Sequence, residues 1–313
     1  MLPDAPPRPS GFARGMTDTA TFSAIDLSRL PAPAVVEPLS YEAIYGQMLA
    51  RLRQFIPDFD DSIESDPAVR ILQVCAYFRM LDLQRVNDAA RAGMVAYALG
   101  ADLDHLGALV GVARLELVPA GEDGTPAIME SDDDFRRRIV LAPEGFSVAG
   151  PAGAYIAHAL AAHSDVLDAS VVSPAPAEVV VYVLSRVGDG TASPALLDAV
   201  EAALSDERVR PIADRLTVLS TEIVAYAIEA EITTYPGPDA SVVMAEALAR
   251  AQALAASLQR NGMDVTRSAI FAALHVAGVQ NVELTAPAAD IVISASKAPH
   301  CTGITLAAGG VAE

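Results

Sequence analysis

The hydrophobic pattern of the chain is most regular between residues 64 and 115. Apolar side chains recur there at alternating steps of three and four residues, which keeps one face of a long α-helix against partner helices. The positions of this seam are Val69, Leu72, Ala76, Leu83, Val86, Ala90 and Tyr97, with Arg79 and Gly93 in its remaining places. The pattern predicts a helix that packs lengthwise against other helices.

The predicted helix has clear signals at both ends. Asp66 can cap its start, because an acidic side chain accepts backbone N–H groups, and Pro67 suits the first helical position, where its missing N–H is not needed. No residue after Ala68 breaks the helix before Gly100, which suits the left-handed position past a helix end, and Gly93 is the one weak point inside. We therefore expect the helix to end at Gly100.

The first half of this helix is apolar nearly all round. The side opposite the seam carries Ile71, Val74, Phe78 and Leu81. A helix of this kind is buried between layers rather than laid on a surface. A second helix is expected from Leu103 to Val110, capped by Asp102 and closed by Gly111.

The chain around these helices divides into four parts. Residues 1–39, rich in proline and glycine, predict an extended N-terminal arm. Residues 40–150 predict a helical domain, with a helix over 41–56, the long helix, a loop over 117–133 and a short helix from 132 that Ser131 caps.

Strand patterns appear only after residue 150. Residues 151–220 and 221–313 each combine apolar strands with amphipathic helices, which describes two small α+β modules. The strands are expected at 166–172, 178–186, 215–220, 221–235, 279–285, 289–294 and 303–309. The predicted fold class is therefore α+β, with an N-terminal helical bundle domain followed by two small α/β-sandwich modules.

Charge and composition exclude several classes of function. The 313 residues carry a formal net charge of −19, which disfavours binding to nucleic acid and to anionic membrane surfaces. No apolar stretch reaches the ~18 residues that a membrane span requires. The two cysteines, Cys75 and Cys301, suit a reduced compartment, although a single disulfide stays open.

The chain offers little chemistry. Asp132, Asp133 and Asp134 could be read as a cation site, but three consecutive helix positions point in different directions, and a helix N-terminus explains them without a metal. No two histidines have zinc-ligand spacing, and no phosphate-binding or nucleophile motif occurs. We predict no catalytic, metal or cofactor residue, and keep a metal-dependent hydrolase as the less favoured alternative.

The segment from Glu64 to Leu115 resembles the signature of the baseplate J-like proteins of contractile-tailed phages and tailocins, in particular their P2-like branch. The matching residues are Glu64–Pro67, Ala76–Tyr77, Gln84–Asn87, Ala89–Arg91, Ala96–Ala98, Gly100, Asp102–Asp104 and Val112–Leu115. Shorter likenesses lie at 25–33, 131–139, 278–287 and 301–306. Phe78 and Met80 depart from the family pattern, in which more polar residues are expected.

The resemblance implies a structural wedge subunit of a tail baseplate, located in the virion and assembled in the bacterial host cytoplasm. In that family two copies of the chain join a tail protein I-like partner through a shared helical bundle. Further domains link neighbouring wedges around the hub and spike, and a lysozyme-like W-type protein joins the ring to the sheath. A scaffold of another contractile injection system is the alternative.

The interface that this role needs is expected on the long helix. Leu72, Ala76, Leu83, Val86 and Ala90 would supply apolar burial, and Arg79 and Arg85 would make hydrogen bonds that set the pairing. The turn from Gln84 to Asn87 is part of the same surface. Two plainer interpretations stay open: the helix builds only its own domain core, and the arginines are solvated surface charges.

Overall fold

The computed structural model describes residues 27, 30, 39–63, 65–147, 149–237 and 239–312. Its contacts form two compact units, one over Ser23–Pro143 and the other containing Glu144–Glu313. The predicted N-terminal arm, residues 1–39, lies outside the described residues except at Leu27, Leu30 and Leu39.

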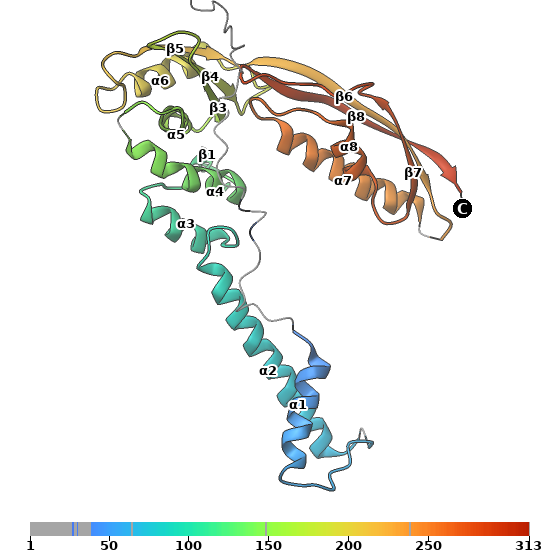
Figure 1. The fold of residues 1–313 in the computed structure, drawn as a ribbon. Coiled ribbons are helices and arrows are strands. Elements are labelled where there is room, and N and C mark those ends of the chain that lie inside the picture. Colours follow the sequence, from blue (N-terminus) through green and yellow to red (C-terminus); the bar gives the residue numbers. More distant parts are fainter. Residues whose placement is uncertain are drawn as a thin grey trace, which may run out of the picture. The chain divides into compact units, whose positions relative to one another are not determined.

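The first unit begins with a pair of packed helices, α1 (Tyr41–Arg53) and α2 (Pro67–Ala92) (Figure 1). The Ser40 hydroxyl caps α1 by accepting the Ala43 N–H at 3.2 Å. The Asp66 carboxylate caps α2 by accepting the Ala68 N–H at 2.7 Å, which confirms the predicted start.

The predicted end of the long helix is wrong. Helix α2 stops at Ala92, and residues 93–97 form turns before α3 (Gly100–Leu109) begins. The Arg136 guanidinium donates to the carbonyls of Val95 (2.8 Å) and Ala98 (2.9 Å), so a distant side chain satisfies backbone groups that leave the helix. Ala98 is buried in the core beyond.

The predicted cap of α3 is also wrong. Asp102 lies within the first turn of α3. The N-cap position is Leu99, whose side chain makes no capping hydrogen bond. The Asp132 carboxylate, 32 residues away, accepts the Gly100 N–H at 3.2–3.3 Å instead. Gly100 itself has φ +52°, so it has the left-handed conformation that its sequence position suggested, at the start of a helix.

The region predicted as a loop contains a short antiparallel hairpin, β1 (Glu116–Val118) with β2 (Ile128–Met129). It leads into α4 (Asp132–Leu141), which Ser131 caps as predicted, and the 3-10 helix η2 (Ala142–Phe146) follows. Phe135 and Ile139 of α4 pack with Ala98 and Leu103 to form the core of this end of the unit.

The second unit starts with a three-stranded sheet and two helices. Helix α5 (Ala152–Ala162) precedes β3 (Val166–Val172) and β4 (Glu178–Ser185), which pair antiparallel. Helix α6 (Pro194–Leu204) then leads to β5 (Arg215–Ser220), which pairs parallel to β4. These elements match the predicted ones.

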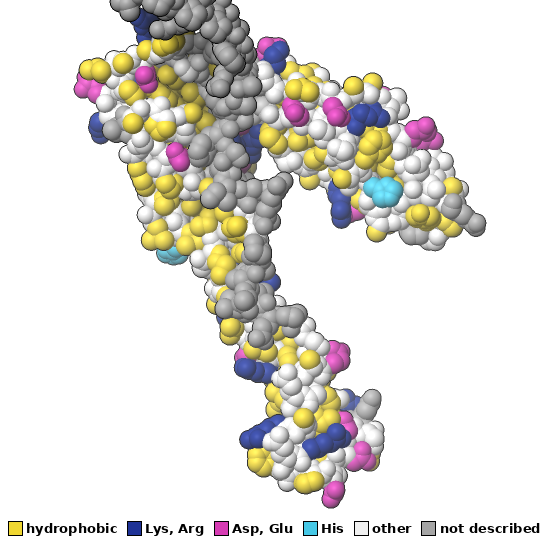
Figure 2. Space-filling view, viewed as in Figure 1, with side chains coloured by type: hydrophobic (Ala, Val, Ile, Leu, Met, Phe, Trp, Pro, Cys, Tyr) yellow, Lys and Arg dark blue, Asp and Glu magenta, His cyan; other side chains and the backbone are white. Residues whose placement is uncertain are grey.

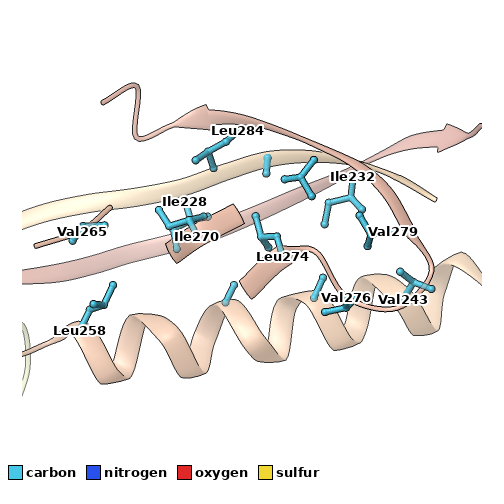
Figure 3. Close-up of a cluster of buried hydrophobic side chains, with 14 of the residues drawn as sticks. Ile228, Ile232, Val243, Leu258, Val265, Ile270, Leu274, Val276, Val279 and Leu284 are labelled. Carbon is cyan, nitrogen blue, oxygen red and sulfur yellow. The ribbon is translucent and has the colours of Figure 1, made fainter. Parts of the chain in front are cut away.

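The chain ends in a second sheet of order β7-β6-β8. The long strand β6 (Glu222–Thr234) is central, with β7 (Val279–Ala286) antiparallel and β8 (Lys297–Val311) parallel to it. Helices α7 (Ala240–Leu258) and α8 (Arg267–Leu274) cover one face, and their apolar side chains meet those of the sheet in one core (Figure 3).

The predicted strand at residues 289–294 is wrong. In that segment Ile291 makes only an isolated bridge to Val265. Two carboxylates hold it: Asp290 accepts the Arg267 N–H, and Asp264 accepts the Ile293 N–H, each at 2.7 Å. Strand β8 already pairs with β6, so residues 289–294 do not form a further strand beside it. The alternating apolar residues of this segment pack instead of pairing in a sheet. The mixture of helices and small sheets confirms the α+β class.

Candidate assembly surfaces

An apolar stripe runs along the outward face of α2. Its residues are spaced three, four and three apart, so they lie on one side of the helix, and their exposed fractions are 64% for Ile71, 54% for Val74, 60% for Phe78 and 38% for Leu81. The sequence predicts that these side chains are buried between layers, but the described part of the chain leaves them exposed. Figure 2 shows hydrophobic side chains at the surface of the α1–α2 hairpin beside arginines.

The eight predicted interface residues are spread over different environments. Ala76 is fully buried and Asn87 is 7% exposed, so both are already occupied by packing within the chain. Leu72, Leu83 and Ala90 are half-buried, and Arg79, Arg85 and Val86 are exposed. The larger exposed apolar surface of α2 is the opposite stripe. The sequence shows that these stripe residues share one face of the helix, but not whether that face is buried within the chain or exposed.

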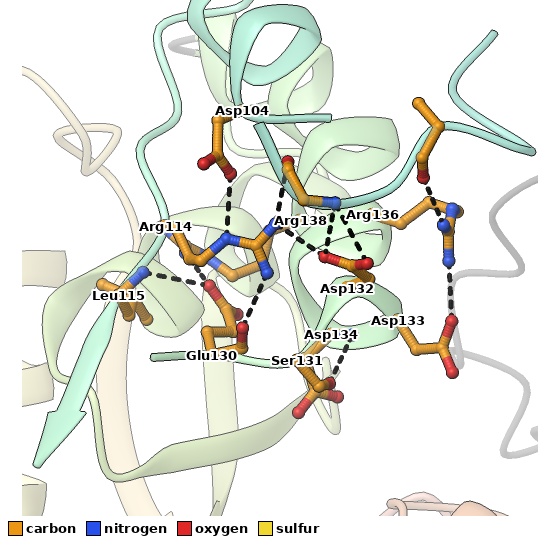
Figure 4. Close-up of polar contacts among 12 residues, drawn as sticks. Asp104, Arg114, Leu115, Glu130, Ser131, Asp132, Asp133, Asp134, Arg136 and Arg138 are labelled. Atoms are coloured by element: carbon orange, nitrogen blue, oxygen red, sulfur yellow. Dashed lines mark hydrogen bonds and ion pairs between the residues drawn. The ribbon is translucent and has the colours of Figure 1, made fainter. Parts of the chain in front are cut away.

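A network around Arg114 joins α3, the hairpin and α4 (Figure 4). Its guanidinium pairs with Asp104 at 2.8 Å and Asp132 at 2.7 Å, and donates to the Glu130 carbonyl at 2.7 Å. It also lies 4.8 Å from the centroid of the Phe135 ring, a cation–π contact. Asp132 therefore pairs with Arg114 and also accepts the N–H at the N-terminus of α3.

Electrostatics agree with this assignment. Burial by itself raises the pKa of Asp132, but the Arg114 hydrogen bond and the Gly100 N–H outweigh it and hold that pKa below its usual value. Asp133 pairs with Arg136 at 2.6 Å, and the Asp134 N–H donates to the Ser131 hydroxyl. Over residues 39–63, 65–147, 149–237 and 239–312, no group of three or more His, Cys, Asp or Glu side chains could hold a metal ion.

A buried ion pair fixes the hairpin to α4. Glu130 is 2% exposed, and its carboxylate accepts from Arg138 at 2.6 Å and from the Leu115 N–H at 3.2 Å. Its second oxygen, Oε1, is buried without a hydrogen-bond partner in the structure. Since removing one member of a buried pair leaves an uncompensated charge, this contact strongly specifies how the hairpin docks.

A second polar cluster joins the turn after α7 to strands β3 and β4 of the second unit. The Asn261 amide donates to Ser170 Oγ and to the Tyr182 carbonyl, both at 3.1 Å, and accepts from Thr221 Oγ1 at 3.0 Å. Its backbone N–H donates to Asp168 Oδ2 at 2.9 Å. Asn261, Ser170, Asp168 and Thr221 are all buried, so the cluster holds one module on the other. No sequence motif marks these residues, because Asn261 lies 40 to 93 positions from its partners.

Two further features bear on earlier expectations. Cys75 and Cys301 are both free, so the disulfide left open by the sequence is absent. Among the described residues, none of the helices has the length and apolar character that crossing a bilayer requires.

Comparisons with known proteins match nearly the whole chain. Residues 64–121 match the model of the baseplate J-like N-terminal domain, 147–220 the baseplate J-like central domain, and 226–307 the C-terminal domain of baseplate J-like proteins. Baseplate protein J of Escherichia phage P2 is 46% identical over 299 residues, covering 92% of this chain and 99% of that protein.

Among solved structures, the baseplate of the anti-feeding prophage aligns with 57% of this chain and 42% of that one, at 16% identity and a TM-score of 0.35. That score carries no argument about this fold. The three family models and the relative from phage P2 show that the chain belongs to the baseplate J-like family and is a structural component of a phage tail baseplate.

Proposed function

We propose that this chain is a wedge subunit of a contractile phage-tail or tailocin baseplate. Two copies would join one tail protein I-like subunit through a bundle built on α1 and α2. The other domains would contact a W-type lysozyme-like protein, neighbouring wedges, the hub and the spike, after assembly in the host cytoplasm. Membership in the baseplate J-like family supports this role, since its members act within a multi-subunit particle.

The observation that carries the proposal is the exposed stripe of Ile71, Val74, Phe78 and Leu81. Helix α1 packs on one side of α2, and no described residue covers the stripe on the other side, which supports a covering helix from another chain. Complete burial of such a side chain contributes about 1.5–3 kcal/mol, so covering the stripe would favour association with a partner helix. Exposed apolar surface of this kind is typical of a site that binds another protein, which supports the proposal.

The predicted interface residues take two places in this arrangement. Arg79, Arg85 and Val86 are exposed and would meet partner helices directly. Leu72, Ala76, Leu83, Asn87 and Ala90 would form the layer beneath, in the core of the completed bundle.

The test is co-purification of this chain with a tail protein I-like protein from the same phage. Phe78→Asp should abolish co-purification, because an unpaired buried charge costs several kcal/mol, which is more than a tenfold loss of affinity. Leu83→Asp should do the same by disturbing the layer beneath. Ile212→Asp is the matched control, because Ile212 is 105% exposed in the second unit and should leave co-purification intact.

Folding must be shown separately for each variant. Amide exchange over residues 144–313 should be the same in Phe78→Asp and in the parent chain. Normal co-purification of a folded Phe78→Asp chain would contradict the stripe as the partner surface.

A further inference from the structure

Strand β8 leaves one edge of the C-terminal sheet open. It stands at the end of the order β7-β6-β8, so among the described residues it has one strand neighbour, β6. Figure 1 shows it running along the side of β6 to the C-terminus. Its first residues include Lys297 and Pro299, but the nine residues Gly303–Val311, GITLAAGGV, contain neither a charge nor a proline.

The opposite edge of the same sheet is protected in the usual way. Strand β7 has only eight residues, carries Glu283 in its middle, and is followed by Pro287. Edge strands usually carry such charges and prolines because their free N–H and C=O groups otherwise pair with other chains. The 15-residue β8 lacks this protection over its second half, which indicates that the assembled state covers it.

The two faces of β8 show what kind of strand would fit. On the inner face, Ile304 and Leu306 are partly buried against the core and pair in register with Ile228 and Ala230. A strand added at this edge would therefore continue the apolar layer with its inward side chains.

The outer face of the sheet is acidic. Glu229, Glu231 and Glu283 are exposed there, and Glu231 lies directly opposite Glu283, a repulsive cross-strand pair. No described Lys or Arg forms an ion pair with any of the three.

The small residues of β8 leave these carboxylates accessible from the open edge. Glu229 and Glu231 are in register with Thr305 and Ala307. A Cβ placed on Gly309 would lie 2.8 Å from Glu231 Oε1, so this carboxylate already extends over β8. An added strand would lie about 10 Å from β6, two strand spacings away, a gap that lysine and glutamate side chains together can span.

We propose that the β8 edge over Gly303–Val311 accepts an extended strand from a different polypeptide, one that alternates basic outward residues with apolar inward ones. Main-chain hydrogen bonds would supply the pairing, and the outward Lys or Arg side chains would neutralise Glu229 and Glu231. A second copy of this chain fits less well, because it would bring the same acidic face to the contact.

The test uses the full chain and a defined probe, an eight-residue peptide alternating lysine and valine with blocked ends. We expect saturable binding that weakens with added salt, and slowed amide exchange within residues 303–311. A peptide alternating glutamate and valine should bind at least tenfold more weakly. Binding of the lysine peptide without protection of 303–311 would overturn the proposal, since it would show only attraction to an acidic protein.

Matched variants separate this edge from general charge effects. Glu231→Lys should weaken binding at least tenfold, and Ala307→Lys should do the same by placing an amine over the carboxylates. Glu246→Lys changes the net charge equally at an exposed position of α7, where Glu246 pairs with Arg250, and should change binding less than twofold. Equal losses in Glu231→Lys and Glu246→Lys would contradict the proposal.

The oligomeric state of the free chain tests the alternative that a second copy of this chain occupies the β8 edge. A dimer in solution whose 303–311 amides are protected without peptide would show that a second copy occupies the edge, and would overturn the choice of a basic partner. A monomer with rapid exchange in this segment is the expected result.

Discussion

Single buried polar residues determine how the parts of each unit meet. Glu130 and Arg138 hold the hairpin on α4, and Asn261 attaches the turn after α7 to strands β3 and β4. Because a buried polar group costs free energy unless it is hydrogen-bonded, each of these residues favours one arrangement over nearby alternatives. Apolar packing is less selective, since many arrangements bury similar area.

Asn261→Ala should lower the free energy of unfolding of the second unit by about 1–3 kcal/mol or more, because Ser170, Tyr182 and Thr221 lose buried partners. Thermal unfolding followed by circular dichroism measures the change. Asn281→Ala is the control, because Asn281 is exposed on β7 and its removal should have little effect. Equal stability of the two variants would show that the cluster does not hold the modules together.

At the scale of elements, helix lengths here depend on contacts from outside the helix. Helix α2 ends at Ala92 although its apolar pattern continues to Tyr97. The backbone carbonyls after the helix accept hydrogen bonds from Arg136, and Ala98 is buried in the core, so the non-helical turns are stable. The packing of α3 on α4 likewise depends on a contact between residues far apart in the sequence. A Cβ on Gly107 would lie 2.5 Å from Phe135 Cζ and 2.9 Å from the Val112 carbonyl oxygen.

Gly107→Ala should therefore destabilise the first unit by about 1–3 kcal/mol, the range for overpacking a tight core. Gly46→Ala on α1 is the matched substitution, because a Cβ there meets nothing within 4 Å. It should stabilise α1 by about 0.5–1 kcal/mol, since alanine loses less backbone entropy than glycine. Urea unfolding measures both, and a stabilising Gly107→Ala would show that α3 and α4 are not closely packed there.

At the scale of the whole molecule, the chain contains two compact units, each with its own buried core. The baseplate J-like models also divide the chain, at residues 121–147 and 220–226. Such a chain stabilises its units separately and needs partners for the apolar surface that remains exposed.

We expect calorimetry to resolve two unfolding transitions for this reason. Gly107→Ala should shift one transition and Asn261→Ala the other, and the double variant should show both shifts unchanged, as independent sites do. A single transition that both substitutions shift together would mean that the units unfold as one.

The sequence by itself determined the local structure. Caps at Ser40, Asp66 and Ser131, the period of α2 and the alternation in β6 each depend on residues a few positions apart, so they could be predicted. The resemblance of residues 64–115 to baseplate J-like proteins likewise rested on the order of residues alone, and the comparisons confirm it.

Only the tertiary structure decided which surfaces are covered. It placed Asp132 on Gly100, ended α2 at Ala92, buried Ala76 and exposed the stripe around Phe78. Among the described strands it also placed β8 at the edge of its sheet, which the apolar pattern of β8 does not predict. The physical reason is common to all five: spacing along the chain shows which side chains share a face, but the contacts that cover a face come from residues far away in the sequence or from another chain.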